Sequence, residues 1–212
     1  MLIEIFLRRR VLHLLLILLL FVLLFLMSVI LFIETKNKMF SLFNLHSFFI
    51  MIKPHHKLHN TDDSMLQFNN VPLKLQRIDT KPKGLWYSFG TQWVDWCSCE
   101  MPDWIKPYNY QLDVLGGNIL KIFSEEDLLK FNDNFSTTIQ FYPKGPQMKV
   151  IDWTKVCSEY DGIEIANKKE NYEFFWKFRY DPDFSWYNSW DIGSGCIWNK
   201  CEMVIKAHCK YQ

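Results

Sequence analysis

The sequence predicts an α+β protein, in which an N-terminal transmembrane helix precedes one globular domain with a mixed or mostly antiparallel sheet and short helices. Two observations predict this class. An uninterrupted apolar run begins at Leu14 and ends at Ile33, and as a helix it would be about 30 Å long, like the hydrocarbon core of a bilayer. After residue 70, strand and helix patterns mix without strict alternation, which is typical of α+β folds.

Residues 1–36 are predicted to form an anchor, with its transmembrane helix at about 12–33. Arginines occupy positions 8–10. They favour a cytoplasmic N-terminus and a C-terminal domain on the non-cytoplasmic side, although lysines beyond the run weaken this bias. The run is longer than the core of a signal peptide, and no small-residue cleavage site follows it. We therefore expect a single-pass membrane protein with an uncleaved signal-anchor. The lipid bilayer is then one of its partners, and a membrane is its location.

Residues 37–70 are predicted to be an amphipathic juxtamembrane segment and a linker. Residues 39–52 are apolar but too few to span a bilayer. They suggest an interfacial helix, with a re-entrant segment as the alternative. The polar stretch 53–64 shows no periodicity and is predicted to be a linker. It contains His55, His56 and His59, which could bind a metal, but a segment without fixed geometry favours a solvated spacer and no metal site.

Residues 71–212 are predicted to form the globular domain. Alternating apolar residues or short apolar runs predict strands at 72–78, 85–88, 108–114, 118–123, 163–165, 196–198 and 203–208. Helical spacing predicts a helix at 91–100. Ser124 and Asp152 are good N-cap residues, so helices are expected at about 124–131 and 153–160.

Aromatic residues and charge bear on partners. All nine Trp and all nine Tyr follow Leu85, which predicts an aromatic core, a ring-lined groove, or both. In such a groove Trp86 and Tyr87 are candidate binding residues. Asp191 and Ser194 lie in a small-residue loop that forms either a tight turn or a polar turn beside a pocket. Residues 41–212 carry 19 basic and 21 acidic side chains. This balance predicts no nucleic-acid partner, and we expect an unknown protein as the partner.

Several motifs together resemble a family of uncharacterised proteins from phages, bacteria and large DNA viruses. They are KPKGLWYS at 81–88, IDW at 151–153, YDGIEI at 160–165 and WDIGSGCIW at 190–198. The resemblance covers about residues 77–199. It implies a shared domain and a viral source, with a host membrane as the location, but no reaction.

A second resemblance is to ADP-ribosyltransferases, which have an Arg on a first strand, a Gly-Leu-Trp-x-Ser strand and a Glu on a later strand. It implies NAD as cofactor, Arg77 and Ser88 as residues that shape the NAD pocket, and Glu164 as the residue that stabilises the sugar cation. The spacing from Arg77 to Ser88 is short for this class, and Gly162 stands where a second acid or Gln is usual. The enzyme hypothesis requires that the three side chains converge on one ring-lined pocket.

The six cysteines leave three alternatives open: reduced structural thiols, disulfides with 15 possible pairings, and a zinc site of unusual spacing. Asn134 begins a glycosylation sequon that would be used only in a luminal domain. We therefore expect a single-pass membrane protein that presents an aromatic-rich domain for binding or structure. The alternative is a membrane-tethered transferase that uses NAD.

Overall fold

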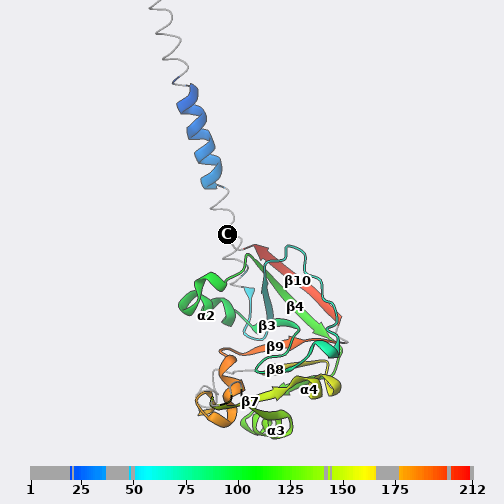
Figure 1. Ribbon diagram of the computed structural model, residues 1–212. Coiled ribbons are helices and arrows are strands. Elements are labelled where there is room, and N and C mark those ends of the chain that lie inside the picture. The colour runs from blue at the N-terminus through cyan, green and yellow to red at the C-terminus, as the bar shows by residue number, and fades with distance from the viewer. Residues whose placement is uncertain are drawn as a thin grey trace, which may run out of the picture. The chain divides into compact units, whose positions relative to one another are not determined.

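A computed structural model of the protein describes residues 20, 22–36, 48, 51–140, 143, 145–165, 177–199 and 202–210. The chain divides into two compact units, residues 1–47 together with Gln212, and residues 48–211. Because the units are not placed relative to each other, each is considered by itself (Figure 1). Every strand among the described residues belongs to the second unit.

The expectation of a transmembrane helix is contradicted. Residues 22–36 form a continuous helix, but no helix among the described residues is long and apolar enough to cross a membrane. The described helical stretch ends on polar residues, whereas a span needs about 20 apolar residues. The predicted single-pass topology, signal-anchor and placement of the domain beyond a membrane are therefore corrected. The predicted interfacial helix at 39–52 lies mostly outside the residues that the structure describes.

The second unit confirms the α+β class. A seven-stranded sheet has the order β10-β4-β1-β3-β9-β8-β5, and only β5 and β8 pair in parallel. Its strands are β1 (Lys57–Thr61), β3 (Leu85–Phe89), β4 (Tyr108–Leu115), β5 (Ile119–Ile122), β8 (Gly162–Ile165), β9 (Ser194–Ile197) and β10 (Glu202–Lys210). A three-stranded antiparallel sheet has the order β2-β7-β6, from β2 (Ile78–Asp79), β7 (Gln147–Asp152) and β6 (Ser136–Gln140). The larger sheet is thus mixed, as expected, and the smaller one is antiparallel.

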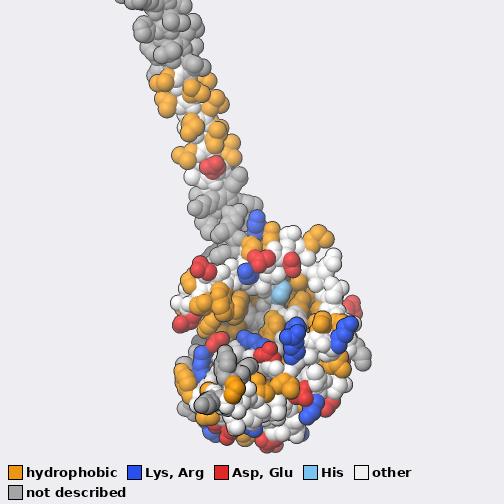
Figure 2. All heavy atoms as spheres, viewed as in Figure 1, with side chains coloured by type: hydrophobic (Ala, Val, Ile, Leu, Met, Phe, Trp, Pro, Cys, Tyr) orange, Lys and Arg blue, Asp and Glu red, His pale blue; other side chains and the backbone are white. Residues whose placement is uncertain are grey.

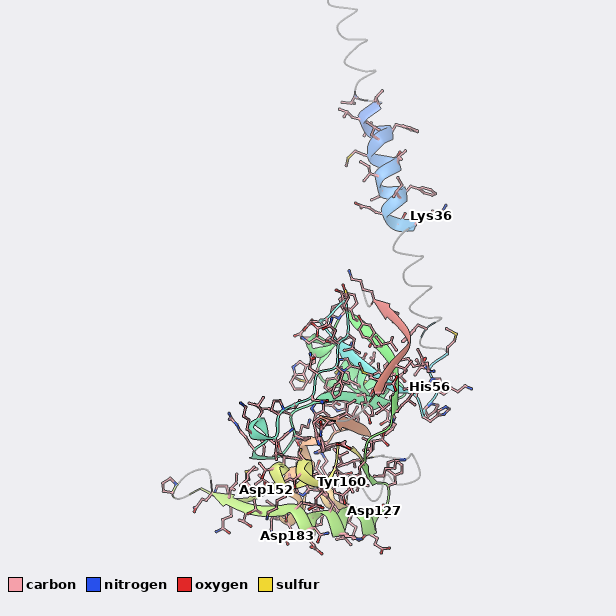
Figure 3. All side chains as sticks on the ribbon, turned by 90° about the vertical axis from the view of Figure 1, so that its right-hand side faces the viewer. Lys36, His56, Asp127, Asp152, Tyr160 and Asp183 are labelled. Carbon is pink, nitrogen blue, oxygen red and sulfur yellow. The ribbon has the colours of Figure 1, made fainter. Side chains whose placement is uncertain are left out.

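Three α-helices and three 3-10 helices have both ends within the described residues of this unit. They are α2 (Gln92–Glu100), α3 (Glu125–Phe135), α4 (Trp153–Glu159), η1 (Leu73–Leu75), η2 (Pro102–Trp104) and η4 (Pro182–Ser189). Both predicted caps are confirmed. Ser124 and Asp127 form a reciprocal capping box at α3, and the Asp152 carboxylate accepts from the backbone of Thr154 at α4 (Figure 3). These bonds lower the pKa of both carboxyls, and the largest contribution comes from the Ser124 and Thr154 hydroxyls.

The main hydrophobic core is aromatic. It gathers the buried faces of β5, β7, β8 and β9 against α3, α4 and η4. Trp153, Trp186, Trp190 and Trp198 are all fully buried, and each indole N–H donates to a protein oxygen. A smaller core contains Phe48, Leu58 and Val94. The predicted aromatic core is therefore confirmed.

The structure departs from the predicted elements at several places. The stretch predicted as a strand at 72–78 is η1 flanked by irregular backbone, and only its last residue enters β2. Lys57–Thr61 was assigned to the linker, yet it is β1, a central strand whose partners lie about 30 to 50 residues away. Gly116 and Gly117 join β4 to β5 with positive φ angles of 66° and 74°. With these angles β4 is followed by β5 at the opposite edge in the strand order, so the two strands do not pair as a hairpin.

Candidate functional site

A pocket of about 370 Å³ lies where two central strands separate. β1 pairs with β3 only through Lys57↔Phe89 and Leu58↔Ser88, whereas β1 continues along β4 and β3 continues along β9. Three consecutive residues from each separating strand therefore line the pocket. The full lining is Leu58, His59, Asn60, Lys81, Trp86, Tyr87, Ser88, Trp93, Trp104, Lys106, Ser189, Trp190, Asp191, Ile192 and Ser194.

His59 fills the point of separation. Its Nδ1 lies 2.5 Å from the carbonyl oxygen of Trp86, so the ring takes the place of a ladder hydrogen bond between the two strands. Since a carbonyl can only accept, Nδ1 carries the proton in this contact. Burial lowers the pKa of His59, and the hydrogen bond to Trp86 opposes this shift. The neutral ring is therefore favoured, with Nε2 as an acceptor.

Aromatic rings form much of the pocket wall. The rings of Trp86 and Trp190 lie 4.9 Å apart between centroids at a tilt of 58°, and those of Trp93 and Trp104 lie 6.3 Å apart and nearly parallel. These spacings are typical of favourable ring pairs. Tyr87 also lines the pocket, but its ring packs over Gly195 and its hydroxyl donates to Glu164. Since Trp190 is fully buried, a flat ligand could contact apolar faces contributed by β3, α2 and η2.

The charges in the pocket are unequally neutralised. Asp191 is paired with Arg179 at 2.8 Å, and Lys106 with Asp62 at 3.0 Å. The ammonium of Lys81 lies 5.4 Å from the centroid of the Trp86 ring. Lys81 as a residue is exposed, but desolvation of its ammonium lowers its pKa, an effect that the nearby Asp191 carboxylate opposes. Within the part of the chain that the structure describes, no carboxylate lies within ion-pair distance of Lys81.

The loop that carries Asp191 is fixed on both sides. The backbone N–H of Gly193 donates to Oε1 of Gln92 on α2 at 3.0 Å, and the Gly193 carbonyl accepts from the backbone of Phe89 at 3.2 Å. These two bonds connect the loop to a helix and a strand about 100 residues earlier. The position of this loop is therefore fixed relative to β3 and α2, which both contribute residues to the pocket.

The four predicted binding residues, Trp86, Tyr87, Asp191 and Ser194, all line this pocket. Their role in binding stays a prediction. The loop at 191–193 serves both as the turn before β9 and as a pocket wall.

The three predicted catalytic residues do not converge. Ser88 lines the pocket, but its hydroxyl points to the carbonyls of Leu58 and Gly90, both at 3.4 Å. Arg77 is exposed and lies outside the lining. Glu164 is also outside the lining, because it sits on β8, beyond β9. The requirement of the transferase hypothesis is therefore not met by this set.

Glu164 has a different environment. It is only 4 % exposed, and its Oε1 accepts from the Tyr87 hydroxyl at 2.8 Å and from Nζ of Lys57 at 2.6 Å. The Tyr87 ring lies directly over Gly195, where a Cβ atom would come within 2.6 Å of the hydroxyl. Gly195 therefore makes room for the ring that reaches from β3 across β9 to β8. The arrangement links three strands through one buried carboxylate.

Sequence reasoning missed several lining residues. His59 was considered only as one of three linker histidines that could bind a metal. Among the described residues, no group of three His, Cys, Asp or Glu side chains could hold a metal ion. Lys81 is the first residue of the KPKGLWYS motif, and this position was the only feature of the sequence that singled it out. Trp93, Trp104 and Trp190 belonged to the general aromatic excess. The five cysteines that the structure describes are free, and Asn134 lies exposed near the end of α3, with no support for a luminal setting.

Comparison with known proteins identifies no relative. No family model matches the chain, and neither a curated protein nor a solved structure is significantly similar to it. The resemblances to the uncharacterised viral and bacterial family and to ADP-ribosyltransferases thus stay predictions. Function has to be argued from the pocket itself.

Proposed function

We propose that residues 51–210 form a binding module whose pocket takes a nucleotide-type ligand, a flat ring joined to a phosphate. The observation that carries this proposal is the position of Lys81, whose ammonium stands over Trp86 at the pocket and lacks a carboxylate partner within the described chain. A cation beside a ring-lined wall suits a ligand that combines an aromatic ring with a negative charge.

The size and walls of the pocket support a ligand of this class. A volume of about 370 Å³ falls within the roughly 300–1,000 Å³ of small-molecule sites. Stacking of a base on an aromatic side chain contributes about 1–3 kcal/mol. Three of the lining tryptophans, Trp86, Trp93 and Trp104, keep part of their surface exposed, whereas Trp190 is fully buried. A flat ring would cover apolar surface that water now contacts.

The polar groups of the pocket also suit a nucleotide. Asp191 is neutralised by Arg179, so it repels an anion less than a free carboxylate would. The neutral His59 ring stands at the wall that β1 contributes. Nε2 of His59 can accept a hydrogen bond from a hydroxyl or amino group of the ligand. Phosphate would lie toward Lys81, and the ring toward the tryptophans.

This proposal keeps the predicted binding role of the aromatic-rich domain and names the chemistry of its ligand. NAD is one ligand of this class, and it enters only as a probe. Transfer chemistry through Arg77, Ser88 and Glu164 is not part of the proposal, because these side chains do not meet at the pocket.

The test compares AMP with adenosine, which lacks the phosphate, by calorimetric titration of the full chain. The informative variant is Lys81→Gln, and Lys83→Gln is the matched control because Lys83 is exposed and outside the lining. We expect AMP to bind more tightly than adenosine, Lys81→Gln to weaken AMP at least fivefold while adenosine is unchanged, and Lys83→Gln to behave as wild type. The proposal fails if neither AMP nor NAD binds at millimolar concentration, or if Lys81→Gln leaves AMP affinity unchanged.

A further inference from the structure

The segment from Gln92 to Trp104, which contains α2 and η2, carries acidic side chains without any basic one. It contains Asp95, Glu100 and Asp103 and no Lys, Arg or His. All three carboxylates are exposed. None of them is in an ion pair with another described residue. The chain as a whole carries a net charge of +1, so this negative charge is local.

The same segment presents three tryptophans that pack on one another. The ring centroids of Trp93 and Trp96 are 5.5 Å apart with an interplanar angle of 23°, and Trp104 lies 6.3 Å from Trp93 and 6.1 Å from Trp96. Trp104 is 49 % exposed. Figure 2 shows the resulting orange patch over α2, next to a hollow and bordered by red acidic side chains. We call these three rings with their three carboxylates the acidic tryptophan patch.

The spacing along the helix places rings and charge together. Trp93, Trp96 and Glu100 follow one another at intervals of three and four residues, so they share one face of α2. Asp103 directly precedes Trp104 on η2. Trp93 and Trp104 also line the pocket, whereas Trp96 and the three carboxylates lie outside its lining.

This combination suits a cation. Ammonium and guanidinium groups are attracted to the faces of aromatic rings, Trp most of all, and Arg also stacks on them. Three unpaired carboxylates add attraction of the same sign and would repel an anionic partner. A nine-residue helix is about 13 Å long, the length of roughly four residues of extended chain. The patch thus matches a short basic peptide segment better than a single small cation.

We propose that the acidic tryptophan patch binds a basic segment of another protein, with arginine or lysine side chains on the rings and against the carboxylates. Trp96 and Glu100 do not line the pocket, so this inference does not rest on the nucleotide-type ligand. The two surfaces meet at Trp93 and Trp104, which belong to both.

The test uses the full chain and a fluorescein-labelled hexa-arginine peptide, with binding followed by anisotropy. The main variant is the charge reversal Glu100→Lys with Asp103→Lys. Both positions are exposed, so folding should be unaffected. The matched control is Asp133→Lys with Glu159→Lys, two exposed acids on α3 and α4. We expect the patch variant to weaken binding at least tenfold and the control to stay within twofold of wild type.

A ring variant separates stacking from charge. Trp96→Leu removes one ring that is outside the pocket, and thermal unfolding checks that the variant is folded. We expect at least fivefold weaker hexa-arginine binding with unchanged AMP binding. The inference is overturned if hexa-arginine does not bind at millimolar concentration, or if the two charge-reversal variants lose affinity equally. It is also overturned if hexaglutamate binds as well as hexa-arginine. Loss of AMP binding in Lys81→Gln with intact peptide binding would separate the two proposals.

Discussion

The buried Lys57–Glu164 pair yields a quantitative prediction for Lys57→Met. Nζ of Lys57 lies 2.6 Å from Oε1 of Glu164, with the side chains 21 % and 5 % exposed. The substitution keeps the length and apolar contacts of the Lys57 stem but removes its charge. Glu164 is then left as a buried carboxylate whose remaining described side-chain partner is the hydroxyl of Tyr87.

The expected cost follows from this burial. Removing one partner of a buried ion pair destabilises proteins by about 3–5 kcal/mol, because the other charge stays buried without compensation. We expect the lower end, about 3 kcal/mol, since Lys57 is one-fifth exposed and Tyr87 still donates to the carboxylate. Relative to a typical unfolding free energy of about 5–15 kcal/mol, this is a large loss.

The assay is urea unfolding of the full chain followed by tryptophan fluorescence and circular dichroism. An internal control is Lys206→Met, since Lys206 pairs with Asp113 at 3.1 Å but both side chains are about half exposed. Such surface pairs contribute at most about 1 kcal/mol. The double variant Lys57→Met with Glu164→Gln removes both charges and retains an acceptor for Tyr87, so it should be more stable than Lys57→Met alone. Equal losses in Lys57→Met and Lys206→Met, or no recovery in the double variant, would refute this account of Glu164.

Three further predictions concern other buried groups. Gly195→Ala places a Cβ against the Tyr87 ring and should cost about 1–3 kcal/mol in urea unfolding through overpacking; a wild-type midpoint would show that the ring is not held there. Burial lowers the pKa of His59 from its ordinary 6.5, so the unfolded chain takes up this proton at a higher pH than the folded chain. Stability should therefore fall as pH drops below about 6.5. His59→Gln should reduce the stability difference between pH 7.5 and 5.5, and an unchanged difference would contradict this. Cys99 is exposed, whereas burial raises the pKa of the Cys196 thiol well above its ordinary value. Mass spectrometry should therefore find maleimide on Cys99 in the folded protein and on Cys196 only after unfolding. Labelling of Cys196 in the folded protein would count against its burial.

Several local elements could be predicted because the signals lie within a few residues of one another. Ser124 and Asp127 identify the start of α3, since a capping box needs only four consecutive residues. The apolar residues of β3 and β8 likewise predict strands. The apolar run at 14–33 was a poorer guide. Composition alone predicted a spanning helix, whereas no described helix is long and apolar enough to cross a membrane.

By itself, the sequence determined the α+β class, the helix caps, the aromatic core and four side chains that prove to line one pocket. Tertiary structure alone decided that Lys57–Thr61 is a central strand, that His59 separates β1 from β3, and that Glu164 pairs with Lys57 instead of meeting Arg77 and Ser88. The physical reason is the sequence separation between the residues that interact. Caps and periodicity act between near neighbours, but the order of strands in a sheet depends on pairing between segments tens of residues apart, and that order decides which side chains share a cavity.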